Sequence, residues 1–142
     1  MQPQVFISNS EEETRQFAEE FSAGLKSGQV LALYGDLGAG KTVFTQGLCR
    51  GLGCREVVNS PSYTLVNIYR GKWTVYHVDC YRLNSAEEIN DLDPDRLFEP
   101  DGITLIEWAE RVEKYLPENC IRIKIEHQDE NIRRLEINLP DC

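Results

Sequence analysis

Residues 35–42 constrain this chain more than any other feature, because they read G-D-L-G-A-G-K-T and fit the pattern G-x-x-x-x-G-K-[S/T] of a phosphate-binding loop. The residues before them, 29–34, form a short apolar run bounded by glycines, which is typical of a buried strand. Residues 41–51 are predicted to form the helix that follows. A strand, a glycine loop and a helix in this order are the setting that the motif requires.

The residue types in this loop suit phosphate binding. Glycines let backbone N–H groups turn toward phosphate oxygens, and the helix N-terminus adds a partial positive charge. We expect Lys41 to reach the β- and γ-phosphates and the Thr42 hydroxyl to bind Mg²⁺. The alternative is a glycine turn before an ordinary helix. The predicted nucleotide-binding residues of the loop are Gly35, Asp36, Leu37, Gly38, Ala39, Gly40, Lys41 and Thr42.

Length and composition narrow the class of protein. A chain of 142 residues predicts a single domain over residues 1–142. We find no apolar run long enough to span a bilayer and no signal peptide in the first residues, so we expect no membrane partner. The five cysteines are scattered and form no C-x-x-C motif, which disfavours a zinc site. A cytoplasmic protein with reduced thiols is the simplest explanation of this pattern.

The charge balance argues against a nucleic-acid-binding surface. The chain has 24 acidic against 15 basic residues and a formal net charge of −9. Binding to nucleic acid needs lysines and arginines that neutralise phosphates. If RNA is the final substrate, we expect another protein to hold it.

Local patterns predict the remaining elements. Ser10 and Glu13 form the capping box of an amphipathic helix that ends near Gly28. A second capping box, from Ser85, predicts a short helix that Pro94 ends. We expect strands at 65–69, 73–78, 102–106, 121–125 and 135–139, and a further short helix at 110–115.

The order of these elements predicts the fold class. The strands at 65–69 and 73–78 should form an antiparallel hairpin, and the last two strands a second antiparallel pair with one face to solvent. Mixed strands around a P-loop unit predict an α/β fold of the three-layer, P-loop NTPase-like kind. Its central sheet should be partly parallel and extended by antiparallel strands.

Hydrolysis of a bound nucleotide also needs a carboxylate near Mg²⁺. Glu107 follows the apolar run 103–106, where the acid of a Walker-B strand lies, and Asp79 ends the strand at 73–78. Thr42, Glu107 and Asp79 are therefore the candidate metal-binding residues. Either acid could instead be a solvated acid at a strand end, which is common in a chain this acidic.

Three further features each allow two interpretations. The hydroxyls of the polar loop at 59–64 could contact phosphate or Mg²⁺ as a switch loop does, or the loop could be a simple turn. His77 alternates with apolar residues, so we expect a core or half-buried histidine rather than a catalytic one. Trp108 could belong to the core or face a partner.

Four motifs in this order resemble the TsaE family, formerly called YjeE, of bacterial P-loop ATPases. The motifs are G-D-L-G-A-G-K-T at 35–42, N-S-P-S-Y-T-L-V-N at 59–67, H-V-D-C-Y-R-L at 77–83 and I-E-W-A-E at 106–110. The resemblance covers almost the whole chain. It implies an ATPase that takes part in threonylcarbamoyladenosine synthesis on tRNA, with ATP and Mg²⁺ as cofactors. The family acts with the proteins TsaB and TsaD, driving or resetting their complex, so tRNA would be contacted only indirectly through these partners.

The resemblance also implies roles by position. Asp79 and Glu107 correspond to the family's catalytic acids, and Thr14 and Arg133 correspond to weaker positions near the nucleotide. Trp108 adjoins the acid and is a candidate partner-facing residue. The switch-like segment of the family corresponds to Ser60, Pro61, Ser62, Tyr63 and Thr64. The residues do not distinguish which acid orients the attacking water.

Competing interpretations come from other P-loop classes. A small-molecule kinase would cover the phosphates with an arginine-rich lid, but only Arg133 and Arg134 are adjacent here. A GTPase-like switch usually carries N-K-x-D, which does not occur. A nucleotide-gated binding module without turnover is disfavoured by Asp79 and Glu107. The small-molecule kinase remains the main alternative.

Overall fold

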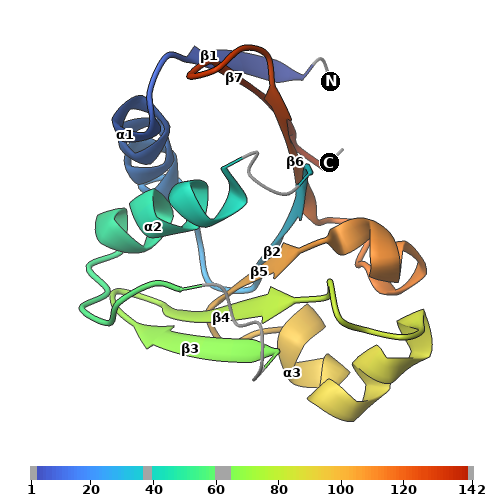
Figure 1. Ribbon diagram of the computed structural model, residues 1–142. Coiled ribbons are helices and arrows are strands. Elements are labelled where there is room, and N and C mark those ends of the chain that lie inside the picture. Colours follow the sequence, from blue (N-terminus) through green and yellow to red (C-terminus); the bar gives the residue numbers. More distant parts are fainter. Residues whose placement is uncertain (1–2, 37–39, 60–64, 141–142) are drawn as a thin grey trace.

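The computed structural model describes residues 3–36, 40–59 and 65–140, which form a seven-stranded sheet between two layers of helices (Figure 1). Helices α1 and α2 cover one face, and α3 with the 3₁₀ helices η1 and η2 covers the other. This arrangement confirms the predicted three-layer α/β fold. The elements are β1 (Gln4–Ser8), α1 (Glu11–Ser22), β2 (Gln29–Tyr34), α2 (Lys41–Gly51), β3 (Val66–Arg70), β4 (Thr74–Asp79), η1 (Ala86–Leu92), α3 (Pro94–Phe98), β5 (Ile103–Glu107), η2 (Ala109–Tyr115), β6 (Ile121–His127) and β7 (Arg133–Asn138).

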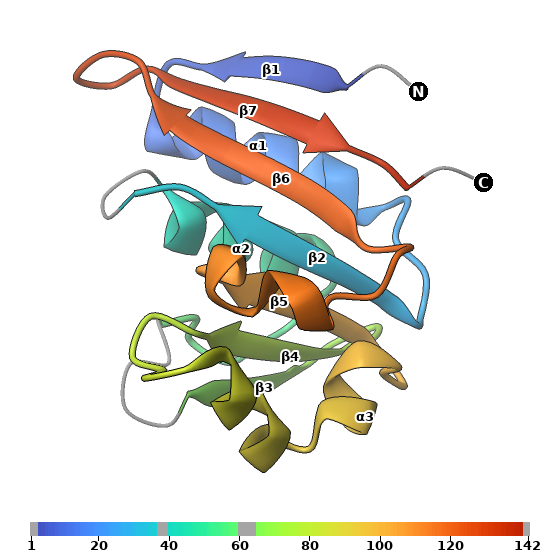
Figure 2. The same cartoon turned by 90° about the vertical axis from the view of Figure 1, so that its right-hand side faces the viewer.

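The sheet is parallel at its centre and antiparallel at both edges. The strand order is β1-β7-β6-β2-β5-β4-β3, and Figure 2 shows the sheet with one face toward the viewer. Strand β2 pairs in parallel with β5 and β6, and β4 pairs in parallel with β5. The hairpin β3–β4 and the pair β6–β7 are antiparallel, as the sequence predicts. Because β2, β4, β5 and β6 run in parallel, their carboxyl ends meet at one edge of the sheet.

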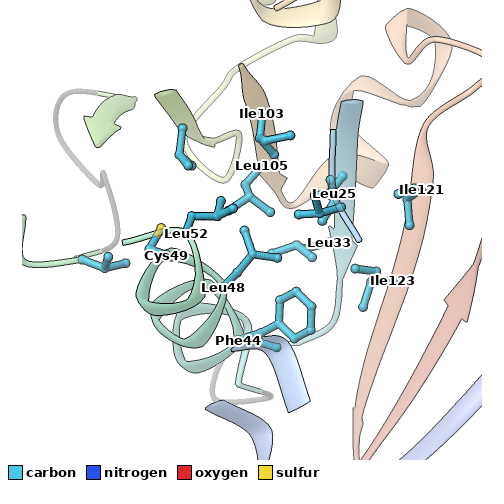
Figure 3. Packing of buried hydrophobic residues seen from close by; sticks show 14 of the residues in the cluster. Leu25, Leu33, Phe44, Leu48, Cys49, Leu52, Ile103, Leu105, Ile121 and Ile123 are labelled. Atoms are coloured by element: carbon cyan, nitrogen blue, oxygen red, sulfur yellow. The ribbon is translucent and has the colours of Figure 1, made fainter. Parts of the chain in front are cut away.

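Each face of the central strands packs against its own helical layer. In β2, Leu31 and Leu33 face α1 and α2, whereas the alternate residues face the layer of α3 and the 3₁₀ helices. Figure 3 shows Phe44 and Leu48 of α2 packed beside Leu33. This alternation is the period-2 pattern of a strand buried on both sides.

Helices α1 and α2 approach each other closely at two glycines of α2. A Cβ on Gly47 would lie 2.3 Å from the carbonyl oxygen of Arg15, and one on Gly51 would lie 2.0 Å from Ser22 Oγ. Helix α2 then ends in a Schellman motif, since Cys54 N–H donates to the Cys49 carbonyl and Gly53 adopts φ +76°. The close packing fixes α2, whose first residue is Lys41, against the rest of the fold.

Several predicted boundaries differ from the structure. Helix α1 begins at the predicted cap, where Ser10 Oγ accepts from Glu13 N–H at 3.1 Å, but it ends at Ser22 rather than near Gly28. Pro94 does not end a helix: it occupies the first turn of α3, where proline is tolerated. The segment before it is a 3₁₀ helix, and so is the one predicted at 110–115.

Strand β1 is absent from the sequence-based prediction. It pairs only with β7, and Val5 and Ile7 on its outer face are exposed. The apolar signal of such an edge strand is weak. In the described part of the chain, no helix has the length and apolar character needed to cross a membrane.

Candidate functional site

The glycine loop leads from the carboxyl end of β2 into α2. Gly40 adopts φ +109°, a left-handed conformation that favours glycine, and immediately precedes the first helical residue, Lys41. The first turn of α2 contains no acidic residue, and Gly40 provides no side-chain cap. The first turn of α1, in contrast, carries three glutamates and a serine cap. Leu37, Gly38 and Ala39 lie outside the described residues.

Lys41 lies at the centre of the candidate site. Its Nζ donates to the Gly35 carbonyl at 2.5 Å and lies 3.4 Å from the centroid of the Trp108 ring. Burial lowers the pKa of Lys41, and nearby carboxylates, first among them Glu107, oppose this effect. Trp108 is half-buried, adopts φ +58° directly after β5, and also packs on Tyr81 with ring centroids 4.8 Å apart. The tryptophan therefore contacts the P-loop lysine itself.

Asp79 and Glu107 end two neighbouring parallel strands. They are register partners between β4 and β5, and their alternation puts both on the face that α2 covers. Only 7% of Asp79 and 3% of Glu107 is exposed, so neither is an ordinary solvated acid. Asp79 Oδ1 accepts from Tyr81 N–H at 2.9 Å. The structure thus brings both candidate acids to the edge from which α2 starts.

His77 is fully buried, as expected for a core histidine, but it is bonded to a candidate acid. Its Nε2 lies 2.5 Å from Glu107 Oε2, and its Nδ1 lies 3.1 Å from the Tyr69 hydroxyl. That hydroxyl is 3.0 Å from the Asn59 carbonyl. Sequence reasoning missed this connection. The available signal was alternation in β4, which puts His77 and Asp79 on the same face.

Thr14 and Arg133 lie together at the same end of the sheet as the P-loop. Thr14 Oγ1 is 2.6 Å from Ser8 Oγ, and Ser8 is the register partner of Arg133. The Arg133 guanidinium donates to the carbonyl oxygens of the turn at 129–132. A Cβ on Gly40 would lie 3.9 Å from Ile125, in the strand that pairs with the start of β7.

The switch-like residues Ser60, Pro61, Ser62, Tyr63 and Thr64 lie outside the described residues, but the residues that flank them are anchored near the acids. Before them, the Asn59 carbonyl is bonded to the Tyr69 hydroxyl. After them, the Leu65 carbonyl accepts from Asp79 N–H at 2.9 Å.

The described residues gather no cluster of three or more His, Cys, Asp or Glu side chains that could hold a metal ion. A Mg²⁺ ion that is bound together with a nucleotide usually has one or two protein carboxylates as ligands beside phosphate oxygens. Thr42, which is half-buried in the first turn of α2, remains a predicted ligand with Asp79 and Glu107.

Comparison with known proteins identifies the family. A family model described as "Threonylcarbamoyl adenosine biosynthesis protein TsaE" matches residues 8–135. The tRNA threonylcarbamoyladenosine biosynthesis protein TsaE of Bacillus subtilis is 42% identical over 125 residues, which cover 87% of this chain and 78% of that protein. The protein of the same name from Treponema pallidum is 40% identical over 119 residues, covering 84% and 88% of the two chains.

A solved structure resembles the whole fold. The crystal structure of B. subtilis YdiB superposes with a TM-score of 0.82 at 33% identity, covering 98% of this chain and 86% of that one. The family match spans the P-loop, both acids, all of β6 and the first residues of β7. This chain belongs to the TsaE family of tRNA threonylcarbamoyladenosine biosynthesis proteins.

Proposed function

We propose that this chain binds ATP with Mg²⁺ and hydrolyses it as the nucleotide-turnover subunit for threonylcarbamoylation of tRNA adenosine, acting with TsaB and TsaD to drive or reset their complex. One observation carries the proposal. Asp79 and Glu107, buried register partners on β4 and β5, share a sheet edge with Lys41 of the P-loop. A phosphate-binding lysine and carboxylates near Mg²⁺ are the parts that ATP hydrolysis requires.

The start of α2 fits a triphosphate. The N–H groups of its first turn have no intrahelical acceptors, and Gly40 supplies no side-chain oxygen to satisfy them. The turn also lacks an acid that would repel an anion. These features support phosphate binding at this helix end by the glycine loop at 35–40, Lys41 and Thr42.

Each remaining residue then has a defined task. Lys41 exchanges its contact with the Gly35 carbonyl for the β- and γ-phosphates, where it neutralises charge. Bound Mg²⁺ would neutralise the charge that develops between these phosphates. Asp79, Glu107 and the Thr42 hydroxyl would hold that ion, and one of the two acids would orient the attacking water. Thr14 and Arg133 bind the nucleotide more peripherally, and residues 60–64 act as the switch-like segment.

The proposed partners agree with the charge of the chain. With a net charge of −9, the chain is poorly suited to hold tRNA, so TsaB and TsaD would contact the RNA. Trp108 is our candidate for contact with those partners. We further propose that the chain acts as one domain in the cytoplasm, which its free cysteines, Cys49, Cys54, Cys80 and Cys120, support.

The decisive experiment measures phosphate release from ATP by the purified chain, alone and with TsaB and TsaD. We expect slow basal turnover that Mg²⁺ removal abolishes and that the partners raise, since a partner group can add about 10³–10⁵ in rate. Lys41→Ala should abolish turnover and weaken ATP binding.

GTP and a set of small phosphoacceptors serve as controls. Wild-type turnover by Lys41→Ala would refute the P-loop assignment. Transfer of the γ-phosphate to a small acceptor, without any effect of the partners, would favour the kinase alternative.

A further inference from the structure

We propose that His77 is a positioning residue for Glu107: its Nε2–H fixes the orientation of the carboxylate, and the Tyr69 hydroxyl fixes the orientation of the imidazole. This inference rests on the proposed function, because it assigns His77 a part in the reaction that Glu107 would catalyse. It gives a role to His77, the first residue of the motif at 77–83, and to Tyr69, which lies in none of the four motifs.

The contacts form a continuous chain in the interior. The distance from Glu107 Oε2 to His77 Nε2 is 2.5 Å, and the distance from His77 Nδ1 to the Tyr69 oxygen is 3.1 Å. All three residues are at most 3% exposed. A short hydrogen bond to a carboxylate is stronger than one between neutral groups. Both ring nitrogens of His77 are therefore engaged inside the protein, and one of them is bonded to the acid.

The carboxylate partner determines that Nε2 of His77 carries a proton. The single Tyr69 proton lies near two acceptors, His77 Nδ1 and the Asn59 carbonyl. The Asn67 amide Nδ2 also donates to the Asn59 carbonyl, at 3.2 Å. An ionised Glu107 carboxylate can only accept, so the 2.5 Å contact is a bond donated by His77 Nε2–H, and the Tyr69 hydroxyl contacts the other ring nitrogen, Nδ1. A partner on one ring nitrogen commonly sets which nitrogen carries the proton in this way.

The position of the chain explains why orientation matters. Glu107 is the last residue of β5, and its backbone pairing with Leu33 and Asp79 does not fix its side-chain torsions. Asp79, its register partner, and Lys41 lie nearby, so a rotated Glu107 carboxylate could turn toward either of them. A bond from the fully buried His77, held by two rigid neighbouring strands, restricts this rotation. Supporting hydrogen bonds of this kind orient the groups that contact a metal or a substrate.

Two substitutions at one position separate a positioning role from a packing role. The amide of His77→Gln reaches the place of Nε2 and can still donate to Glu107. The amide of His77→Asn reaches only the place of Nδ1 and loses that bond. We expect His77→Gln to keep most of the wild-type kcat for ATP hydrolysis, and His77→Asn to lower kcat by about 10- to 100-fold with little change in KM.

A matched pair of tyrosines tests the next step. Tyr69→Phe removes the hydroxyl beside His77 and should lower kcat. Tyr76→Phe removes another buried hydroxyl, bonded to Asp101 on the opposite face of the sheet, and should leave kcat unchanged. If the two hydroxyls contribute only to stability, both variants should lose thermal stability and activity to a similar extent.

The closing test combines His77→Asn with Glu107→Gln. If His77 acts through Glu107, His77→Asn lowers kcat little further in a chain that already carries Glu107→Gln. Equal kcat in His77→Gln and His77→Asn, or full additivity in the double variant, would overturn the positioning role. The proposed function would still stand in that case, provided that the wild-type chain hydrolyses ATP. Absence of wild-type hydrolysis would overturn both.

A readout independent of turnover is the imidazole N–H signal in the NMR spectrum, which is simple because the chain has two histidines. We expect one exchange-protected signal that persists in His127→Gln and disappears in Glu107→Ala. Its persistence in Glu107→Ala would contradict the bond on which the proposal depends.

Discussion

Replacing Gly47 by alanine should destabilise the protein, although alanine is the better helix former. The new Cβ would lie 2.3 Å from the Arg15 carbonyl oxygen, 2.6 Å from its Cα and 2.8 Å from its carbonyl carbon. Ordinary contact begins at 3.4 Å, so α1 and α2 would have to separate by about 1.1 Å at this point. All three contacts are backbone atoms of α1, which no rotation of a side chain can remove.

Two opposing effects set the magnitude. Alanine for glycine inside a helix gains about 1 kcal/mol of helix propensity. Overpacking at a close contact costs about 1–3 kcal/mol, and here the cost lies toward the upper end because whole helices must move. We expect a net loss of about 1–2 kcal/mol in the free energy of unfolding, which lowers Tm by roughly 3–8 °C.

The assay is thermal and urea unfolding of Gly47→Ala beside Gly24→Ala. Gly24 follows α1, and its added Cβ would meet only the Phe21 carbonyl oxygen, at an ordinary 3.8 Å. That control should be neutral or slightly stabilising, because alanine restricts the unfolded chain. Equal or greater stability of Gly47→Ala, relative to the wild type, would refute the close approach of α1 and α2.

Three further predictions concern the candidate site and the thiols. Asp79→Asn and Glu107→Gln should each lower kcat for ATP hydrolysis by roughly 10²–10⁴. Calorimetry should find nearly unchanged ATP affinity, because the start of α2 still holds the phosphates. Wild-type turnover in both variants would show that neither acid takes part in the proposed hydrolysis. Trp108→Ala should reduce stimulation by TsaB and TsaD more than basal turnover, since tryptophan is frequent among binding hot spots; equal losses together with a lowered Tm would assign the ring to the core. A hydrogen bond with the Cys49 side chain lowers the pKa of the half-buried Cys54 thiol, so its thiolate forms at a lower pH than that of an ordinary cysteine. Peptide mapping near neutral pH should therefore find maleimide on Cys54 before the buried Cys49, and the reverse order would contradict the contact.

Local sequence patterns by themselves determined much of this protein. The glycine loop with its strand and helix, the Ser10 cap of α1, and the antiparallel pairs β3–β4 and β6–β7 could all be predicted. These features depend on periodicity, capping and turn chemistry between residues that are close in the chain. The same patterns gave the α/β class and put Asp79 and Glu107 at strand ends.

The tertiary structure alone decided which strand ends meet. Parallel pairing of β4 with β5, through a connection of η1 and α3, makes Asp79 and Glu107 register partners. His77 is bonded to Glu107, and Trp108 contacts Lys41. Both contacts join residues that lie 30 or more positions apart in the chain. Strand β1 likewise forms by antiparallel pairing with β7, which is distant from it in the sequence. Contacts between residues far apart in the chain set these neighbours, and local periodicity does not show which distant strands will pair.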